Sequence, residues 1–299
     1  GYKIEIYEAA EYVGGNCRTL ITGKFKVDTG AHRFHDKDPE MTKEMLSLMG
    51  NKVRDINIPS YIFHRGQLIH FPLTPADVFF NLHFYEVFKA AWYFIMDKFR
   101  YRQTDNFETL VYRKYGRYIS NLFLTNYSEK LWGEKCKNLS TEVAGSRLKN
   151  LNLNSVILEF LFPKKRSKHL EGSFYYPLYG FGEIPKTISS HCGEKNIFLN
   201  SRVKQIKTNG KKISEIELED GKILSPELVI STLPVTLMLK MLYPEPPLEI
   251  LTTAKKLKFR HIKLVIFLLN KKTVNNAATM YFPDQQYIFT RCYEPRNRS

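Results

Sequence analysis

Three residue types near the start of the sequence have the spacing of a nucleotide-binding site. Residues 3–8 alternate charged and apolar side chains, as a strand does, and end on Glu8. In a dinucleotide-binding fold, an acidic residue at such a strand end accepts hydrogen bonds from ribose hydroxyls. Gly14 and Gly15 follow, and paired glycines let backbone N–H groups approach an anion closely. Arg18, just beyond, can place a fixed positive charge beside a pyrophosphate.

The elements that must position these residues are short strands interrupted by a helical region. Residues 25–28 are expected to form a strand and residues 39–49 a helix, with Pro39 early in it. Residues 78–123 are helix-rich, with a capping box expected at Asp105 and Glu108. Hairpin turns are expected at Asn209-Gly210 and Asp220-Gly221, a helix at 237–242, and strands at 213–218, 222–224, 228–232, 261–269 and 287–292. Strand-rich segments on both sides of a helical one imply domains that are discontinuous in sequence.

Composition limits the class of protein. The chain has 299 residues, 43% of them hydrophobic, and Lys and Arg outnumber Asp and Glu by 45 to 30. The charge of +15 favours anionic partners, although the basic residues are scattered rather than clustered as a nucleic-acid surface requires. The four cysteines lie far apart, which supports neither a disulfide framework nor a metal site and fits the cytoplasm. No apolar run reaches the roughly twenty residues of a membrane-spanning helix.

The order of these motifs resembles the flavin-binding amine oxidase superfamily. That family carries an acidic strand end, a GG-x-x-R-T-like loop and a D-x-G-x-H-like loop, and this chain has Glu8, residues 14–19 and Asp28–His32 in the same order. Residues 116–133, Ser140 and residues 147–148 resemble its protoporphyrinogen oxidase-like branch. Residues 175–182 resemble the family's Y-P-x-G-G-x-G element, with Tyr179 where glycine is usual.

The resemblance implies FAD as the cofactor and assigns roles to residues. Glu8 would bind ribose, Gly14, Gly15 and Arg18 would line the path of the pyrophosphate, and His32 would lie near the isoalloxazine ring. The cofactor-binding residues expected in this way are Glu8, Gly14, Gly15, Asn16, Arg18, Thr19, Gly30, Ala31, His32, Val203, Thr232 and Pro234. The substrate-binding residues expected are Arg33, His35, Trp132 and Tyr176, although such aromatic residues are more often core. No acid–base residue stands out, which fits hydride transfer to a flavin.

The expected fold class is α/β, with an incomplete Rossmann-like FAD-binding domain formed by residues 1–55 and 190–245. Residues 56–189 and 246–299 would form a discontinuous α+β substrate domain with a helical insertion at about 76–165. The family's strand–GxGxxG–helix would precede Gly1 and its last flavin-contacting segment would follow Ser299. We therefore expect a fragment that lacks both ends and binds FAD poorly by itself.

Two chemistries are compatible with this resemblance. The first is an FAD-dependent oxidoreductase that transfers hydride from a small-molecule substrate, anionic or lipophilic, to the flavin. The alternative is a redox-neutral reaction on a nucleotide sugar, because Gly30–Asp36 resembles the G-x-H-x-F-H run of UDP-galactopyranose mutases. Nucleic acid is not an expected partner. The aromatic-rich segment 78–99 suggests a peripheral membrane contact. The sequence predicts neither the substrate, the electron acceptor nor the oligomeric state.

Overall fold

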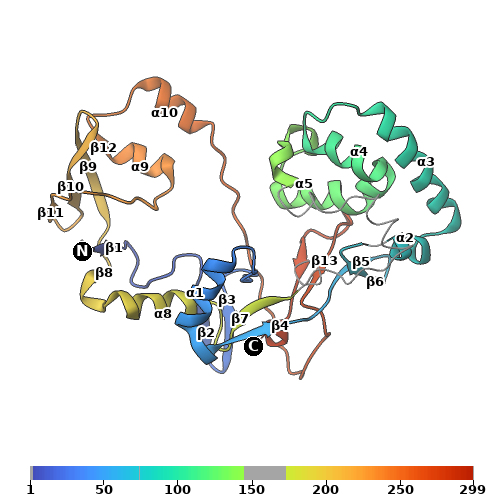
Figure 1. Ribbon diagram of the computed structural model, residues 1–299, viewed down its shortest axis with the longest axis horizontal. Coiled ribbons are helices and arrows are strands. Elements are labelled where there is room, and N and C mark those ends of the chain that lie inside the picture. Colours follow the sequence, from blue (N-terminus) through green and yellow to red (C-terminus); the bar gives the residue numbers. More distant parts are fainter. Residues whose placement is uncertain (1–2, 74, 145–172, 299) are drawn as a thin grey trace. The chain divides into compact units, whose positions relative to one another are not determined.

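The computed structural model describes residues 3–73, 75–144 and 173–298, which form two compact units. The first unit contains residues 3–32, 44–52 and 179–266, and the second contains residues 33–43, 53–178 and 267–298 apart from those outside the described ranges. Both combine helices with small sheets, and the sheets are parallel, antiparallel or mixed (Figure 1). The chain therefore has an α/β fold. The division into cofactor and substrate domains at the boundaries given above stays a prediction.

The first unit contains three small sheets. β1 (Ile6–Tyr7) pairs in parallel with β8 (Ile197–Phe198), and β2 (Thr19–Thr22) forms an antiparallel hairpin with β3 (Phe25–Asp28). The third sheet has the order β11-β10-β9-β12. Its strands are β9 (Val203–Asn209), β10 (Lys212–Leu218), β11 (Ile223–Leu224) and β12 (Leu242–Tyr243).

The two hairpin turns of this third sheet lie where the sequence predicts them. Gly210 and Gly221 have φ angles of +65° and +88°, which L side chains rarely adopt, and this explains the glycine at each turn. Ile206, Ile216 and Leu218 are buried on the sheet. The helices of the unit are α8 (Glu183–Cys192), α9 (Val235–Met241) and α10 (Leu248–Lys255). α1 (Pro39–Met49), which begins in the second unit, has the bounds that the sequence predicts.

The second unit contains a four-stranded sheet and a strand pair. The sheet has the order β14-β13-β5-β6, formed by β14 (Arg291–Cys292), β13 (Thr279–Tyr281), β5 (Ser60–His64) and β6 (Gln67–Phe71). β13 is parallel to β5, and the other neighbours are antiparallel. Separately, β4 (Val53–Ile56) pairs antiparallel with β7 (Phe174–Pro177).

The helices of the second unit provide its two hydrophobic clusters. They are α2 (Pro75–Asn81), α3 (Phe84–Arg100), α4 (Phe107–Ile119) and α5 (Asn126–Trp132), with a π-helical turn at Ser120–Thr125. The aromatic residues of α4 belong to these clusters. Phe107 and Val111 pack with Cys136, and Phe123 packs with Ile62, Ile69 and Leu82. Of the predicted helical insertion, residues 145–165 lie outside the described residues, as do residues 147–148 of the family-like stretch.

α3 is unusual because its two carboxylates point inward. Glu86 is 1% exposed and accepts hydrogen bonds from both terminal nitrogens of Arg65, each at 2.9 Å, and from the Tyr118 hydroxyl at 2.6 Å. Asp97 is 0% exposed and accepts from the Arg117 guanidinium, at 2.6 Å from Nη2, and from the Arg117 backbone N–H at 2.7 Å. These two ion pairs fix the rotation of the helix about its axis.

The Glu86 carboxylate should make the protein sensitive to acid. Burial alone would raise the pKa of Glu86, but hydrogen bonds from Arg65, Tyr118 and the His83 backbone outweigh it and lower the pKa from 4.5 to about 2. The Glu86 carboxylate therefore stabilises the folded state fully at pH values above its unfolded-state pKa of about 4.5. This stabilisation is lost as the pH falls from about 4.5 towards about 2. We expect Glu86→Gln to lower the free energy of unfolding by about 3 kcal/mol near neutral pH. In urea denaturation, the difference from wild type should shrink across this acidic range, and a constant difference would contradict the prediction.

Four sequence predictions about secondary structure are wrong in whole or in part. Residues 228–232 and 261–269 are not strands, and Ile230, for example, is 85% exposed. An apolar run becomes a strand only beside a partner strand, and the described residues place none beside either segment. Of residues 287–292, only the last two are strand. The N-cap of α4 is Asn106 rather than Asp105, because Asn106 Oδ1 accepts the Thr109 N–H at 3.0 Å.

Candidate functional site

The β2–β3 hairpin is joined to the turn before α8 by two polar side chains of the first unit. The Thr19 hydroxyl donates to Asp28 Oδ1 at 2.6 Å and accepts the Gly182 N–H at 2.9 Å. Asp28, which is buried, also accepts the Phe181 N–H at 3.0 Å. Thr19, predicted to contact the cofactor, therefore joins two segments that are about 160 residues apart in sequence. We call this set of contacts the hairpin lock.

Glycines allow the close approach that the hairpin lock requires. Gly180 has φ +100°, and a Cβ there would lie 2.4 Å from Thr19 Oγ1. A Cβ on Gly182 would lie 2.7 Å from the Thr19 backbone nitrogen. Gly14 is packed in the same way, since its Cβ would lie 2.6 Å from Pro185 Cγ on α8. Each of these positions excludes a side chain because protein already fills the space.

Gly15 differs from these glycines. Its φ is +51°, and a Cβ built there meets nothing within 4 Å. The backbone at Gly15 is thus exposed to open space while Gly14 beside it is held against α8. This is the arrangement in which backbone N–H groups can approach an anion from outside the protein.

Arg18 follows Gly15 by three residues in the same loop. Its guanidinium stacks on the Tyr12 ring at 3.9 Å from the centroid, and no carboxylate in the described part of the chain forms an ion pair with it. The Arg18 backbone is fixed by Thr29, whose N–H donates to the Arg18 carbonyl at 2.9 Å. A cation held in this way on an aromatic ring can attract a phosphate without first breaking an internal ion pair.

His32 is held in the same loop. Its Nε2 lies 2.9 Å from the Asn16 carbonyl oxygen, which can only accept, so Nε2 carries the proton in this arrangement. The imidazole stacks on Phe181, with 5.0 Å between ring centroids. Gly30 permits this, because a Cβ there would lie 2.8 Å from His32 Nε2. Asn16, Gly30, Ala31 and His32 are thus part of one folded loop against the hairpin lock.

Glu8 and Val203 lie at one end of the β1–β8 pair. The Glu8 N–H donates to the Phe198 carbonyl at 2.9 Å, and the Glu8 carbonyl accepts the Ser201 N–H at 2.8 Å. Val203 begins β9 two residues later. Glu8 Oε1 accepts the Ala10 N–H at 2.7 Å, which directs the carboxylate along the chain that follows the strand. An acidic side chain at the end of a parallel strand is in the position that binds ribose hydroxyls.

The remaining predicted cofactor residues are exposed. Thr232 precedes α9 in an irregular segment, and Pro234 is the N-cap of that helix. All twelve predicted cofactor-binding residues belong to the first unit, and the four predicted substrate-binding residues belong to the second. The first unit thus contains the glycine backbone at Gly15, the cation of Arg18 and the carboxylate of Glu8. This combination suits a dinucleotide.

In the second unit, two of the predicted substrate-binding residues meet at Phe174. The Arg33 guanidinium lies 4.6 Å from the centroid of that ring and donates to Ser60 and Thr279, while the His35 ring lies 6.1 Å from it. Tyr176 is two residues further along β7 and is buried. Trp132 ends α5, is 45% exposed, and is not part of the ring contacts around Phe174.

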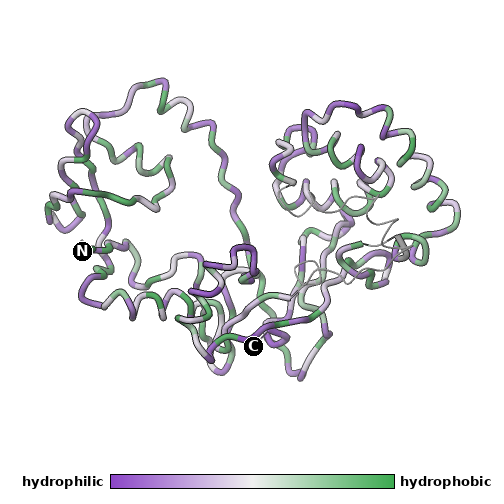
Figure 2. The backbone as a smooth tube through the Cα atoms, in the orientation of Figure 1, coloured by the Kyte–Doolittle hydropathy of each residue, from purple (hydrophilic) through white to green (hydrophobic). Residues whose placement is uncertain are grey.

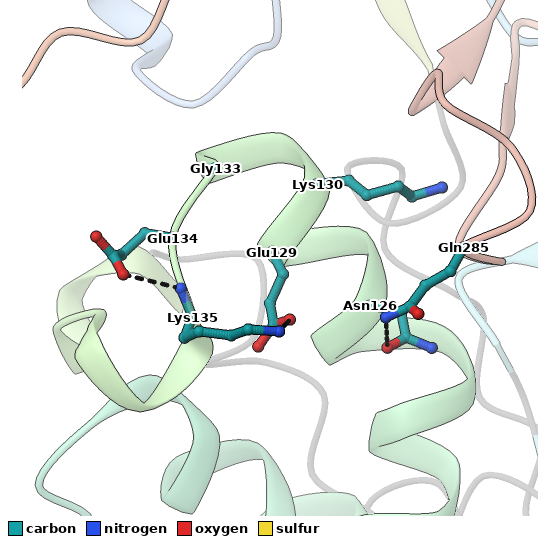
Figure 3. A pocket seen from close by; sticks show the side chains of 7 residues that line it. All are labelled: Asn126, Glu129, Lys130, Gly133, Glu134, Lys135 and Gln285. Atoms are coloured by element: carbon teal, nitrogen blue, oxygen red, sulfur yellow. Dashed lines mark hydrogen bonds and ion pairs between the residues drawn. The ribbon is translucent and has the colours of Figure 1, made fainter.

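An open pocket of about 340 Å³ lies beside α5 (Figure 3). It is lined by Asn126, Glu129, Lys130, Gly133, Glu134, Lys135 and Gln285. Glu129 pairs with Lys135 at 2.7 Å, and the Gln285 amide donates to Asn126 Oδ1 at 3.1 Å. The Lys130 ammonium donates to the carbonyls of Asp284 at 2.8 Å and Tyr287 at 3.1 Å, and also to those of Phe282 and Phe289. Its burial lowers the pKa of Lys130.

Lys130 should therefore hold the 282–289 loop. We expect Lys130→Met to lower the free energy of unfolding by about 2 to 4 kcal/mol, because several carbonyls lose a charged donor. Limited proteolysis should show earlier cleavage within 282–289. The matched control is Lys135→Met on the same pocket: its surface ion pair is worth less than about 1 kcal/mol. Equal effects of the two substitutions would contradict this role for Lys130.

The sequence did not single out several residues of this site. Asp28 occurs in the D-x-G-x-H motif but was not assigned a contact, and Gly180, Phe181 and Gly182 occur in the Y-P-x-G-G-x-G-like element. Those motifs were the signal that could have found them. Nothing in the sequence pattern marks Tyr12 as the partner of Arg18. Within residues 3–73, 75–144 and 173–298 there is no group of three metal-ligating side chains, and no helix there has the length and apolarity needed to cross a membrane.

Comparison with solved structures shows the same fold in flavoenzymes. A reduced UDP-galactopyranose mutase superimposes with a TM-score of 0.77 at 18% identity, over 98% of this chain and 65% of that one. A candidate protoporphyrinogen oxidase from Exiguobacterium sp. 255-15 gives 0.71 at 14% identity, over 99% and 67%. Cyclohexylamine oxidase from Brevibacterium oxydans IH-35A gives 0.52 at 16% identity, over 84% and 57%. The chain thus spans about two thirds of the mutase's length. No curated protein sequence matches it.

The sequence profile of one family matches almost the whole chain. It is described as "Flavin containing amine oxidoreductase", and the match covers residues 1–297. This is the superfamily that the motifs Glu8, residues 14–19 and Asp28–His32 indicate. The chain belongs to the flavin-containing amine oxidoreductase family.

Proposed function

We propose that this chain forms the FAD-binding and substrate-binding part of an oxidoreductase that removes hydride from a small molecule. The observation that carries the proposal is the pairing of the open Gly15 backbone with Arg18, both positioned by a loop that the hairpin lock holds. Family membership supports a flavin. The Rossmann-like character of the first unit, with Glu8 at the end of β1, is part of the proposal.

The residues present fit a flavin dinucleotide. Space is open at Gly15, where a phosphate needs close approach, and it is filled at Gly14, Gly180 and Gly182, where the loop needs support. In the proposed complex, the Glu8 carboxylate accepts hydrogen bonds from ribose, and Arg18 neutralises pyrophosphate charge. His32 presents its ring edge from a fixed orientation. When bound, the flavin supplies the hydride acceptor, and the protein supplies orientation and electrostatics.

Flavin binding by an arginine variant tests the proposal directly. Full-length protein containing this chain should be yellow, and denaturation should release FAD, identified by chromatography. We expect Arg18→Gln to weaken FAD binding by roughly tenfold to a hundredfold, because a charge-assisted contact is lost. The readout is flavin fluorescence during titration. The control is Arg202→Gln, an exposed arginine of the same unit paired with Glu219 at 3.5 Å, which should bind FAD as wild type does. A colourless wild type that takes up no FAD would refute the proposal.

The redox-neutral alternative has its own discriminating experiment. The run Gly30–Asp36, which resembles that of UDP-galactopyranose mutases, favours it, and its His32 and Arg33 are hydrogen-bond donors suited to an anionic substrate. Incubation of the chemically reduced holoenzyme with UDP-galactose, followed by chromatography, would reveal an isomerised sugar. An isomerised product would favour the mutase reaction. An unchanged sugar, together with reduction of an artificial electron acceptor by an amine or porphyrinogen, would favour the oxidoreductase.

A further inference from the structure

The outward face of α3 is apolar along its whole length. Seven side chains lie on this face, and each is between 47% and 74% exposed: Phe84, Tyr85, Phe88, Trp92, Ile95, Met96 and Phe99. Five of them, Phe84, Phe88, Trp92, Ile95 and Phe99, follow one another at intervals of three or four residues, and Tyr85 and Met96 lie beside this row, so all seven are on one side of a helix about 25 Å long. Phe79 and Phe80 at the end of α2 are also exposed. Figure 2 shows hydrophobic stretches recurring along α2 and α3. We call these nine residues the aromatic face.

Cations border the α3 part of this face, and no carboxylate of α3 does. The exposed charged residues of α3 are Lys89, Lys98 and Arg100. Lys89 lies over the Tyr85 ring, 5.4 Å from its centroid. On a helical projection, Lys89 and Arg100 lie along one border of the aromatic face and Lys98 along the other. The only acidic residues of the helix are Glu86 and Asp97, both buried and paired with arginines. The solvent side of α3 is therefore aromatic and positive.

The protein holds this face outward rather than burying it. The ion pairs of Glu86 with Arg65 and of Asp97 with Arg117 require the acidic side of α3 to face α4 and the β5–β6 hairpin. Rotating the helix to bury its aromatic residues would expose two arginine partners and leave the carboxylates unpaired. Contiguous apolar surface of this kind marks an interaction site.

We propose that the aromatic face of α2 and α3 docks on an anionic phospholipid surface. Aromatic and aliphatic side chains would enter the headgroup boundary while the bordering Lys89, Lys98 and Arg100 contact lipid phosphates. The net charge of +15 strengthens this attraction at low salt. A long helix face with cations on both borders matches a broad anionic layer. The proposal is independent of the proposed function, because it uses none of the residues assigned to the flavin.

Trp92 provides a direct reporter of docking. The chain has two tryptophans, so replacing Trp132, together with any tryptophan that the full-length protein has outside this chain, by Phe leaves Trp92 alone. In full-length protein with these substitutions, we expect a blue shift of Trp92 emission on adding vesicles of phosphatidylcholine and phosphatidylglycerol in equal parts. Brominated lipids should quench the emission. Pure phosphatidylcholine vesicles should give a clearly smaller shift, and high salt should reverse it. The absence of a shift with anionic vesicles would overturn the proposal.

Substitutions separate the apolar and charged contributions. Phe88→Ser combined with Trp92→Ser and Phe99→Ser should reduce vesicle co-sedimentation more than about tenfold. Lys89→Glu with Lys98→Glu should remove the preference for anionic vesicles. The controls are Ile288→Ser and Lys137→Glu, exposed residues of the same unit outside α2 and α3, which should bind as wild type does. Circular dichroism confirms folding of each variant. If the serine variant binds vesicles normally, or if it only dissociates a dimer seen by sedimentation velocity, the lipid proposal is wrong.

Discussion

Gly180→Ala should abolish stable flavin binding while leaving the second unit folded. The new Cβ would lie 2.4 Å from Thr19 Oγ1 and 2.5 Å from Thr19 Cγ2, at a backbone φ of +100°. Relieving this overlap moves Thr19 away from Asp28 and the Gly182 N–H, so the loop that carries Arg18 and His32 loses its support. Strain and overpacking together cost about 3 kcal/mol, equivalent to a loss of affinity of more than about a hundredfold.

Flavin absorbance per mole of purified protein is the measurement for this prediction. Gly23→Ala is the matched control, because Gly23 lies at the tip of the same hairpin with φ +56° and no atom within 4 Å of the new Cβ. Thr19→Val separates the hydrogen bonds from the packing, since it keeps the shape but removes the hydroxyl. If Gly180→Ala retains as much flavin as Gly23→Ala does, the hairpin lock does not support the loop that carries Arg18 and His32.

The second large effect is expected at Gly116, inside α4. Gly116 has φ +71° and ψ +146°, and a Cβ there would lie 2.6 Å from the Phe94 backbone nitrogen and 2.8 Å from its Cα. These are backbone atoms of α3 and cannot move aside as a flexible side chain would. The following residue is Arg117, whose N–H and guanidinium bind Asp97. We expect Gly116→Ala to lower the free energy of unfolding by about 3 to 5 kcal/mol.

Denaturant unfolding monitored by circular dichroism measures this loss. Gly210→Ala serves as control, because Gly210 also has a positive φ but has nothing within 4 Å of the added Cβ. It should cost only the local backbone strain, of the order of 1 kcal/mol. A similar loss of unfolding free energy in both variants would mean that the close approach of α3 and α4 at Gly116 contributes little to stability.

Local signals in the sequence were sufficient for the turns and most helices. Asn209-Gly210 and Asp220-Gly221 require positive φ angles and produce hairpins wherever they are flanked by alternating residues. The bounds of α1 and β3 follow from an early proline and from a short alternating run. At α4, Asp105 and Asn106 are both good N-caps, and only the backbone geometry selects Asn106.

The predictions that were wrong concern segments whose structure depends on partners far away in the sequence. Residues 228–232 look like a buried strand because five small or apolar residues adjoin, but pairing is a property of two segments and cannot be seen in one. The motif resemblance drew attention to the loop that contains Arg18 and His32, but not to the role of Thr19 and Asp28 in its internal hydrogen bonding.

The parallel pairing of β1 with β8 determines when this chain can mature during synthesis. Ile6 pairs with Ile197, about 190 residues later, so at about 5 to 20 residues per second a ribosome needs roughly 10 to 40 s to deliver the partner strand. The helices α3, α4 and α5 need only local contacts and can form meanwhile. β5, however, waits for β13 at Thr279–Tyr281. A nascent or prematurely terminated chain that stops before this strand exposes one edge of β5, which makes it a candidate for chaperone binding and aggregation.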